Sequence, residues 1–306
     1  MGFTRGALEA LAAVIREGSF ERAAGALHVT PSAVSQRIKQ LELQVGATLV
    51  VRAAPCVPTP IGAQVYRHAQ QVDVLEADLL ASVAPELDPE AADDLPVLEM
   101  AIAANADSLA TWLMPAVKDV AAQTGVRLEV LLDDEQHTTA LLREGRVLGA
   151  VTAQRRAVQG CRVTPLGTMR YLPQASRRFL RQWLPDGPTV EALRGAPSLA
   201  YNRKDRACEA FLGQHFGLTD VSLTAHRFPS PHAYLEACLG GVGWGLNPEP
   251  LTQSARCRAR LTNLFADAFF DVPLYWQEWS IVSPRMGALA ESLRRHAAER
   301  LRPLSS

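Results

Sequence analysis

Polar side chains recur on one side of a short segment near the N-terminus. In a helix, which turns by about 100° per residue, these side chains share one face. They are Ser32, Ser35, Gln36 and Lys39. The opposite face is apolar and holds Val34, Ile38 and Leu41. Serine, glutamine and lysine reach base edges and phosphate oxygens, and a helix fits the major groove of DNA. The pattern predicts a helix that reads DNA, with an ordinary solvated helix face as the alternative.

The residues around this face indicate a helix-turn-helix. Thr30 is a favourable N-cap and Pro31 suits the first helical position, so the second helix is expected to begin at Pro31. The first helix has the i, i+3, i+4, i+7 spacing of a packed face at Phe20, Ala23, Ala24 and Leu27. A further helix over residues 7–16 would pack beneath the pair. Residues 1–60 are therefore expected to form one DNA-binding domain.

These segments resemble the winged helix-turn-helix of the LysR-type transcriptional regulators. The resemblance continues through LVVR at residues 49–52 and PTPIG at residues 58–62, which are similar to the family's wing and to the start of its linker helix. It implies double-stranded DNA, at a promoter operator, as a partner. Thr30 and Pro31 belong to the implied DNA-binding surface, and Arg52 and Thr59 are its expected phosphate contacts.

Residues 60–84 predict a long amphipathic helix. Its apolar residues recur between polar ones, at Ile61, Val65, Val72, Leu75 and Leu79. A projecting helix must cover such a stripe, and a second copy of the same helix is the simplest partner. The resemblance favours this dimerisation helix, in a homodimer or a homotetramer. Packing against its own chain is the alternative.

The rest of the chain predicts an α/β fold. Residues 85–96 combine prolines with an acidic run and are expected to be an interdomain linker. Beyond them apolar strands and amphipathic helices alternate, which is the rhythm of a parallel sheet. Strands are expected at 97–104, 126–132, 147–152, 222–228 and 274–282, with the second half of the pattern resuming at Tyr171. Helices are expected at 108–123, 138–144, 207–215, 231–240 and 286–301.

The resemblance implies a more specific architecture for residues 97–302. It implies a periplasmic-binding-protein-like, effector-binding domain made of two α/β subdomains, with a ligand cleft between them. Subdomain I would comprise about 97–165 and 269–302, and subdomain II about 166–268, joined by two crossing strands.

Composition limits the other functions. The 306 residues suffice for about two domains, and the net charge of −1 means that any basic surface for DNA must be local. The five cysteines include no C-x-x-C pair and are expected to be buried thiols of a cytoplasmic protein, with a redox-sensing pair as the alternative. No apolar run approaches a membrane span, so no membrane role is expected.

Polar residues follow the first predicted strand of the α/β region. Asn105, Asp107 and Ser108 lie where a strand ends and a helix begins, the usual place for a ligand in an open α/β sheet. Ser108 can cap the helix and still present its hydroxyl to a carboxylate. Asp107 or Ser108 as a simple N-cap is an equally good interpretation.

A second resemblance narrows the effector. AIAANADSLATWLMPAV at residues 101–117 and LYW at 274–276 are similar to the ArgP, LysG and IciA subgroup, whose members respond to lysine and arginine and control basic amino-acid export. With such an effector, Asp133, Asp134 and Glu135 would pair with its ammonium or guanidinium group. Acidic residues of an ordinary first helical turn are the alternative.

The opposite wall of the cleft is expected from the second subdomain. Tyr201 and Asp205 follow a predicted strand, and His232 stands at the start of a predicted helix. The sequence departs from the subgroup here, and a surface or cap role explains His232 better than a ligand contact does.

Two functions are compared. The first is an effector-controlled transcriptional regulator, with RNA polymerase as a further partner. The second is an enzyme or binding module in which the N-terminal helices only form a scaffold. The sequence shows no nucleophile beside a base, no metal-ligand spacing and no cofactor fingerprint. We therefore expect a regulator with no catalytic residue, no metal and no cofactor.

Overall fold

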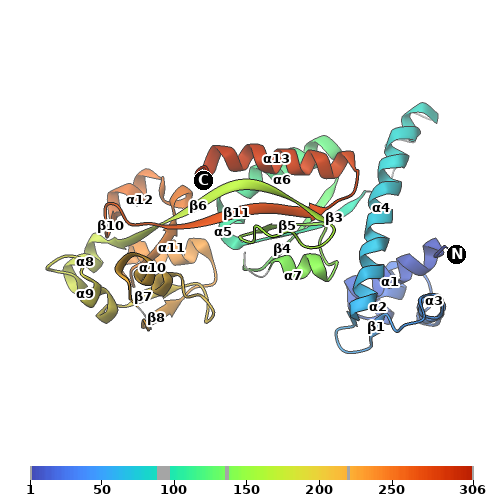
Figure 1. The fold of residues 1–306 in the computed structure, drawn as a ribbon, viewed down its shortest axis with the longest axis horizontal. Helices are drawn as coiled ribbons and strands as arrows, with labels where there is room; N and C mark the ends of the chain where they lie inside the picture. Colours follow the sequence, from blue (N-terminus) through green and yellow to red (C-terminus); the bar gives the residue numbers. More distant parts are fainter. Residues whose placement is uncertain (1, 88–96, 135–137, 219–220, 305–306) are drawn as a thin grey trace.

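The computed structural model describes residues 2–87, 97–134, 138–218 and 221–304. Along the chain, a small N-terminal head is followed by one long helix and then by an α/β domain (Figure 1). The predicted linker at 85–96 lies mostly outside the described residues. Within the described ranges, no helix combines the length and the apolar character needed to cross a membrane.

The head is a helix-turn-helix with a small wing. It contains α1 (Arg5–Glu17), α2 (Phe20–Ala26), α3 (Pro31–Val45), β1 (Val50–Val51) and β2 (Val57–Pro58). The two strands pair antiparallel. The start of α3 at Pro31 confirms the prediction, and the Thr30 hydroxyl caps it by accepting a hydrogen bond from the Ala33 N–H at 3.2 Å. The predicted apolar faces form one buried core beneath the helices.

The long helix α4 (Pro60–Leu87) begins at the predicted residue and continues three residues beyond the predicted end at 84. Thr59 caps it, since its hydroxyl accepts a hydrogen bond from the Gly62 N–H at 2.9 Å. Gly62 permits the close approach of this first turn to the wing, because a Cβ there would lie 1.8 Å from the Leu49 carbonyl oxygen. The cap, the proline and the glycine thus fix where α4 leaves the head.

Seven described strands form the main sheet of the α/β domain. Its neighbours run β10-β6-β11-β5-β3-β4, and β9 also pairs with β6. The parallel part joins β3 to β4 and to β5, as the alternating pattern predicts, whereas β6 and β11 pair antiparallel along their length. The strands are β3 (Glu99–Ala104), β4 (Arg127–Leu132), β5 (Gly149–Thr152), β6 (Cys161–Ser176), β9 (Gly245–Pro248), β10 (Leu261–Asn263) and β11 (Phe270–Trp279).

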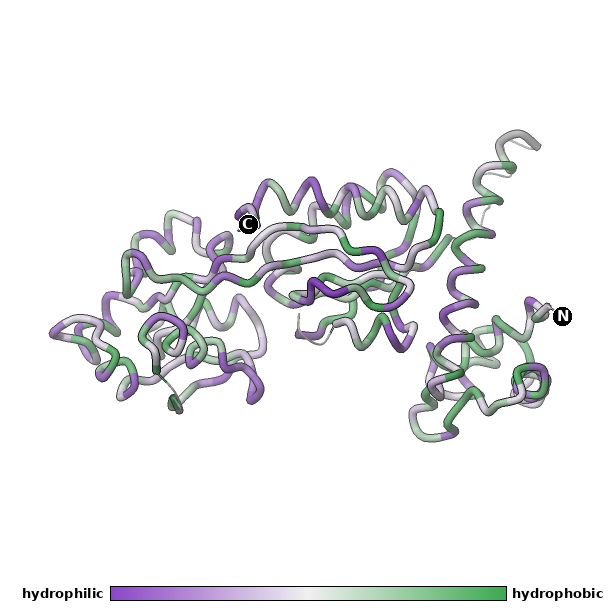
Figure 2. The backbone as a smooth tube through the Cα atoms, in the orientation of Figure 1, coloured by the Kyte–Doolittle hydropathy of each residue, from purple (hydrophilic) through white to green (hydrophobic). Residues whose placement is uncertain are grey.

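Two groups of helices and a small second sheet complete the domain. Figure 1 shows α6 and α13 on one side of the main sheet and α7 on the other, and Figure 2 shows hydrophilic and hydrophobic residues alternating along α13. In the second subdomain the parallel strands β7 (Ser198–Ala200) and β8 (Ala225–Arg227) pair beside the remaining helices. The helices are α5 (Ala106–Ser108), α6 (Met114–Thr124), α7 (Thr138–Arg143), α8 (Arg177–Trp183), α9 (Val190–Gly195), α10 (Ala207–Phe216), α11 (Pro231–Gly240), α12 (Ala255–Arg260) and α13 (Pro284–Arg300).

The structure corrects two sequence expectations. The helix expected at 108–123 is divided into α5, a π-helical turn over Leu109–Leu113 and α6. Pro115 has no N–H to continue the α-helical ladder, which accounts for the change of geometry at this point. The strand expected to resume at Tyr171 already begins at Cys161 as β6. Its first five residues are exposed or only partly buried and include Arg162 and Pro165, so they form no continuous apolar run.

Both halves of the domain share a continuous core. The largest fully buried side chains include Trp112, Trp244 and Trp276, and buried residues from both subdomains belong to this one cluster. All five cysteines are free thiols, and only Cys161 is partly exposed. The long antiparallel ribbon of β6 and β11 runs through this shared core and connects the two packed α/β units (Figure 1).

Candidate functional site

The predicted polar face of α3 is open to solvent. Ser32, Gln36 and Lys39 are exposed and Ser35 is partly exposed. On the opposite side Val34, Ile38 and Leu41 are completely buried in the core of the head. Because the apolar side fixes the rotation of the helix, the polar side chains are presented together at one surface.

The wing and the start of α4 hold the two expected phosphate contacts. Arg52 is exposed, and its guanidinium carbon lies 4.7 Å from the ring centroid of Phe20. The Thr59 hydroxyl donates to the Thr48 carbonyl at 2.7 Å and accepts from the Gly62 N–H. Thr59 therefore caps the start of α4, as the sequence Thr59-Pro60 predicts.

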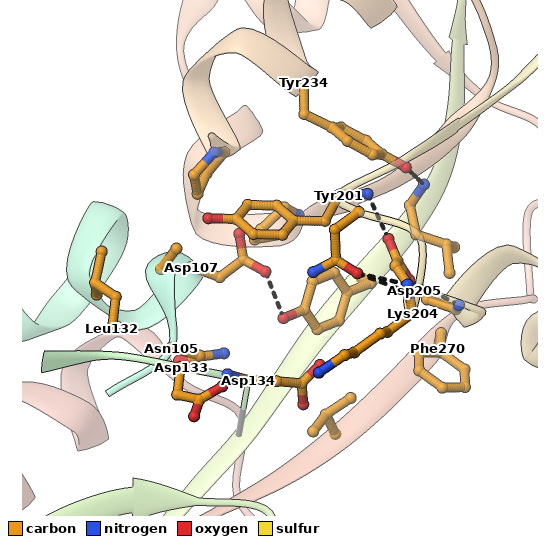
Figure 3. Close-up of a pocket in the computed structure, with 18 of the residues that line it drawn as sticks. Asn105, Asp107, Leu132, Asp133, Asp134, Tyr201, Lys204, Asp205, Tyr234 and Phe270 are labelled. Atoms are coloured by element: carbon orange, nitrogen blue, oxygen red, sulfur yellow. Dashed lines mark hydrogen bonds between the residues drawn. The ribbon is translucent and has the colours of Figure 1, made fainter. Parts of the chain in front are cut away.

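A cleft of about 600 Å³ lies between the two subdomains. Its lining brings together most of the predicted ligand residues, and the close-up in Figure 3 shows how they converge. The predicted residues in the lining are Asn105, Asp107, Asp133, Asp134, Tyr201 and Asp205. They come from the ends of β3, β4 and β7, where the chain leaves each strand.

Asp107 is the carboxyl group whose chemistry the cleft alters most. The Tyr171 hydroxyl donates a hydrogen bond to Asp107 Oδ2 at 2.8 Å. Burial raises the pKa of Asp107 to about 6, the Tyr171 hydrogen bond opposes the rise, and the charge of Asp205 adds to it. Burial and the nearby Asp107 also raise the pKa of Tyr201. A cation that enters the cleft would relieve this accumulation of negative charge.

The loop after β7 is fixed by its own side chains. Asp205 accepts hydrogen bonds from the Tyr201 N–H at 2.6 Å and the Ala207 N–H at 2.9 Å. Asn202 Oδ1 accepts from the N–H groups of Lys204 and Asp205. These bonds hold the backbone of residues 201–205, and Figure 3 shows the Lys204 side chain extending into the cleft toward Asp134.

Three predicted residues are placed differently. Ser108 is buried outside the lining, and its N–H donates to the Asn105 side chain, so Asn105 and not Ser108 caps the helix. His232 is exposed at the start of α11 and does not line the cleft. Glu135 lies outside the described residues. The alternative interpretation, in which this turn holds an N-cap, is therefore correct, but the residue that provides the cap is Asn105.

Other lining residues were not predicted as ligand contacts. Tyr171 and Phe270 belong to strands in which only long-range packing decides which side chains face the cleft. Arg203 and Lys204 lie between the predicted residues Tyr201 and Asp205, and their positive charge was the feature of the sequence that could have identified them. They add two cationic groups to a lining that otherwise carries aspartates.

The cleft therefore carries charges of both signs. Aspartates contributed by both subdomains share it with Arg203 and Lys204, and apolar side chains such as Leu132, Val272 and Phe270 fill the rest of the wall. A ligand with a carboxylate at one end and a cation at the other fits this distribution of charge. Among the described residues, no group of three or more His, Cys, Asp or Glu side chains is arranged to hold a metal ion.

A winged helix-turn-helix joined to a two-subdomain ligand cleft defines a ligand-responsive DNA-binding protein. Two family descriptions cover nearly the whole chain. Residues 6–63 match the bacterial regulatory helix-turn-helix proteins of the lysR family, and residues 95–298 match the LysR substrate binding domain. The chain belongs to the LysR family of transcriptional regulators, as the resemblance of its motifs predicted.

Similar proteins extend along the full chain. The transcriptional regulator LysG of Mycobacterium tuberculosis is 44% identical over 291 residues, covering 95% of this chain and 92% of LysG. ArgP of Pseudomonas fluorescens is 39% identical over 297 residues, covering 97% and 98% of the two chains. These relatives bear the subgroup names that the second resemblance indicated.

Solved structures agree with these relatives. The crystal structure of ArgP from Mycobacterium tuberculosis aligns with a TM-score of 0.83 at 42% identity, covering 97% of this chain and 98% of ArgP. Full-length LysG from Corynebacterium glutamicum with bound effector Arg aligns with a TM-score of 0.75 at 36% identity, covering 98% and 100%. The predicted fold class is confirmed.

Proposed function

We propose that this chain is a DNA-binding transcriptional regulator whose effector is a basic amino acid, arginine or lysine, bound in the cleft. The mixed charge of the lining is the observation that supports the effector most directly, because it offers partners of opposite charge to both the cationic groups and the carboxylate of such a molecule. The similar LysG from Corynebacterium glutamicum, which was solved with its effector Arg bound, supports the same choice. No catalytic step is assigned to the cleft.

The charges suggest an orientation for the ligand. Asp107 lies in the part of the wall closed by Tyr171, and Asp133 and Asp134 stand at the exposed end of β4. These carboxylates suit the side-chain cation of the effector, and a guanidinium can engage a carboxylate in a bidentate manner. Arg203 suits its α-carboxylate.

A thermal-shift titration of the full chain tests this effector. Arginine and lysine are expected to raise the melting temperature by several degrees at saturation, because a ligand at about 100 times its Kd stabilises by about 2.7 kcal/mol. Leucine is the matched control, since it has the same α-amino and α-carboxylate groups without the distal cation. Equal shifts for all three amino acids would contradict a basic effector.

The DNA-binding part of the proposal rests on the open face of α3. Ser32, Ser35, Gln36 and Lys39 would contact the operator, Arg52 would contact phosphate from the wing, and Thr30 and Pro31 would set the start of the helix. Thr59 would support this surface through its cap on α4 and not through a phosphate contact of its hydroxyl. Regulation would then act on RNA polymerase at the promoter that the protein occupies.

The oligomeric part rests on α4. Leu75, Leu79 and Leu80 are 46%, 61% and 45% exposed, so this side of the helix is apolar and uncovered within the chain. A second copy of α4 would bury it, which gives a dimer with two DNA-binding heads. Leu79→Glu is expected to shift the protein toward monomer in sedimentation velocity. Gln64→Glu, at an exposed polar position of the same helix, is the control, and unchanged sedimentation of both variants would contradict this interface.

A further inference from the structure

The linker helix α4 contacts its own α/β domain as well as the head. Packing on its own chain is the alternative to dimerisation for this helix, and one side of α4 does pack in that way. Val74 is 1% exposed and belongs to the core cluster of the α/β domain. Figure 1 shows α4 standing beside the end of the main sheet. The question is what this contact does.

An ion pair with little exposure holds the upper part of the contact. Arg285 Nη1 lies 2.6 Å from Asp78 Oδ1, and the two side chains are only 17% and 11% exposed. Arg285 stands in the first turn of α13, where the helix dipole disfavours a cation. Asp78 compensates for both the guanidinium and the positive end of α13, so removing it would leave uncompensated positive charge at a partly buried site.

A cation–π contact holds the lower part. The Arg67 guanidinium carbon lies 4.1 Å from the ring centroid of Trp279, a residue that is 3% exposed. The Trp279 ring is fixed in turn, because its Nε1 donates to the Val147 carbonyl at 3.3 Å. Such a contact is stronger when it is shielded from water, as it is against this nearly buried ring.

A glycine allows the close approach. Gly145 has a φ of 70°, and a Cβ on it would lie 3.0 Å from the Ala63 carbonyl oxygen and 3.1 Å from Arg67 Cβ. Ala63, Arg67, Val74 and Asp78 lie on one side of α4, and Leu79 and Leu80 lie away from it. The contact with the α/β domain therefore leaves the exposed apolar side available to a second copy.

The contact is continuous with the ligand cleft through one ribbon. Phe270 at the start of β11 lines the cleft, and Trp279 at its other end contacts Arg67. The partner strand β6 has the same arrangement, because Tyr171 lines the cleft and Cys161 pairs with Trp279. Figure 1 shows these two strands running side by side from the second subdomain toward α4.

We infer that Arg67, Asp78, Trp279 and Arg285 form a latch that couples occupancy of the cleft to the position of the DNA-binding head. The inference rests on the proposed function. An effector that draws the subdomains together displaces the ribbon of β6 and β11, and the latch transmits this displacement to α4 and the head. Without the latch, the cleft still binds its effector and the head still binds DNA, but the two events become independent.

The test measures both binding reactions on the full-length protein. Operator affinity is determined with and without saturating arginine, and arginine affinity is determined by calorimetry. In the parent, arginine is expected to change operator affinity by about fivefold or more, in the usual range of allosteric coupling. Arg67→Met and Asp78→Asn are each expected to reduce that ratio to less than about twofold while the arginine Kd stays within about threefold of the parent.

Two further variants complete the design. Arg294→Ala removes an exposed ion pair with Glu291 on the same helix α13 and is expected to keep the parent ratio. The double variant Asp78→Arg with Arg285→Asp reverses the buried pair and is expected to restore part of the ratio, which separates the specific contact from a general loss of stability.

The outcomes distinguish this inference from the proposed function. If arginine changes operator affinity in both latch variants by the same factor as in the parent, the latch is overturned and the proposal of a basic effector still stands. A parent that binds no arginine would overturn the proposed effector, and the latch with it. Loss of arginine binding in the latch variants with normal binding in Arg294→Ala would also overturn it, because the latch is then part of the cleft's own architecture.

Discussion

The polar face of α3 and the cleft of the α/β domain are built in opposite ways. The face of α3 comes from one continuous segment, whose exposed side chains are spaced by the helical repeat. The cleft gathers residues from Asn105 to Val272, which several strands and loops bring together. The first site depends on local periodicity and the second on the packing of distant segments.

This difference has a chemical consequence. Lys39 and Gln36 on α3 are surrounded by water, which screens each of their contacts. Asp107 lies close to Tyr171 and Asp205, and burial raises its pKa. Water stabilises this carboxylate less than it stabilises an exposed one, so a ligand cation has a larger effect on it. A single substitution is therefore expected to have a larger effect in the cleft than on the helix.

The largest effect is expected from Asp107→Asn. The amide keeps the size of the side chain but cannot provide the charge that pairs with a bound cation. Arginine affinity is expected to fall by about 30-fold or more, which corresponds to about 2 kcal/mol. Calorimetry on the full chain measures it. Asp133→Asn, at an exposed carboxyl group of the same cleft, serves as the control and is expected to cost less than about tenfold. Equal losses in both variants would remove the special role of Asp107.

A smaller effect is expected from single substitutions on α3. Gln36→Ala is expected to weaken operator binding by about 1–2 kcal/mol and to relax the preference at one base pair. Lys39→Ala is expected to reduce the slope of log affinity against log salt by about one. Fluorescence anisotropy over a range of salt concentrations measures both. Lys118→Ala, at an exposed lysine of α6, is the matched control, and the assigned face would be wrong if it behaved like Lys39→Ala.

A third prediction concerns pH. The raised pKa of Asp107, about 6, means that protons compete with a cationic effector below that pH. Arginine affinity is expected to fall by about tenfold per pH unit below about 6 and to be nearly constant above 7. In Asp107→Asn the profile is expected to be flat over the same range. Calorimetry between pH 5 and pH 8 decides it, and a profile of the same shape in both proteins would assign the titration to another group.

The raised pKa of Asp107 also makes the free energy of unfolding of the effector-free protein depend on pH. The folded protein holds the Asp107 proton more tightly than the unfolded chain does. The contribution of this group to the free energy of unfolding is therefore fully present at low pH and is lost as the pH rises from the model-peptide value of 3.8 through about 6. Effector binding would oppose that loss by placing a cation beside the ionised carboxylate.

The smallest effect is expected from Thr30→Ala. This change removes the hydroxyl that caps α3 and is expected to lower the free energy of unfolding of the head by about 1 kcal/mol. Arginine affinity should not change, because the cap is remote from the cleft. Urea denaturation and calorimetry give the two values. Thr30→Ser retains the cap and is the control, and a comparable loss with serine would show that packing, not capping, explains the effect.

The helices and caps could be predicted well because they depend on neighbours in the sequence. α3 and α11 begin at the predicted prolines. The cleft was predicted in part, since strand ends identify Asn105, Asp107 and Tyr201 without showing which side chains face inward. Ser108 and His232 are at comparable sequence positions and do not line it. Their orientation depends on the packing of α5 and α11, which short-range sequence patterns do not determine.

Local periodicity, capping and turn residues encode the winged helix-turn-helix, the polar face of α3 and an α/β region with acidic strand ends, so these features are readable in the sequence. Long-range packing brings Tyr171 and Lys204 to the aspartates in one cleft and holds α4 to its own domain through Trp279 and Arg285. These contacts join residues from 64 to more than 200 positions apart. Which of the many apolar and charged side chains meet at such distances is fixed by the packing of the whole core, not by any local pattern.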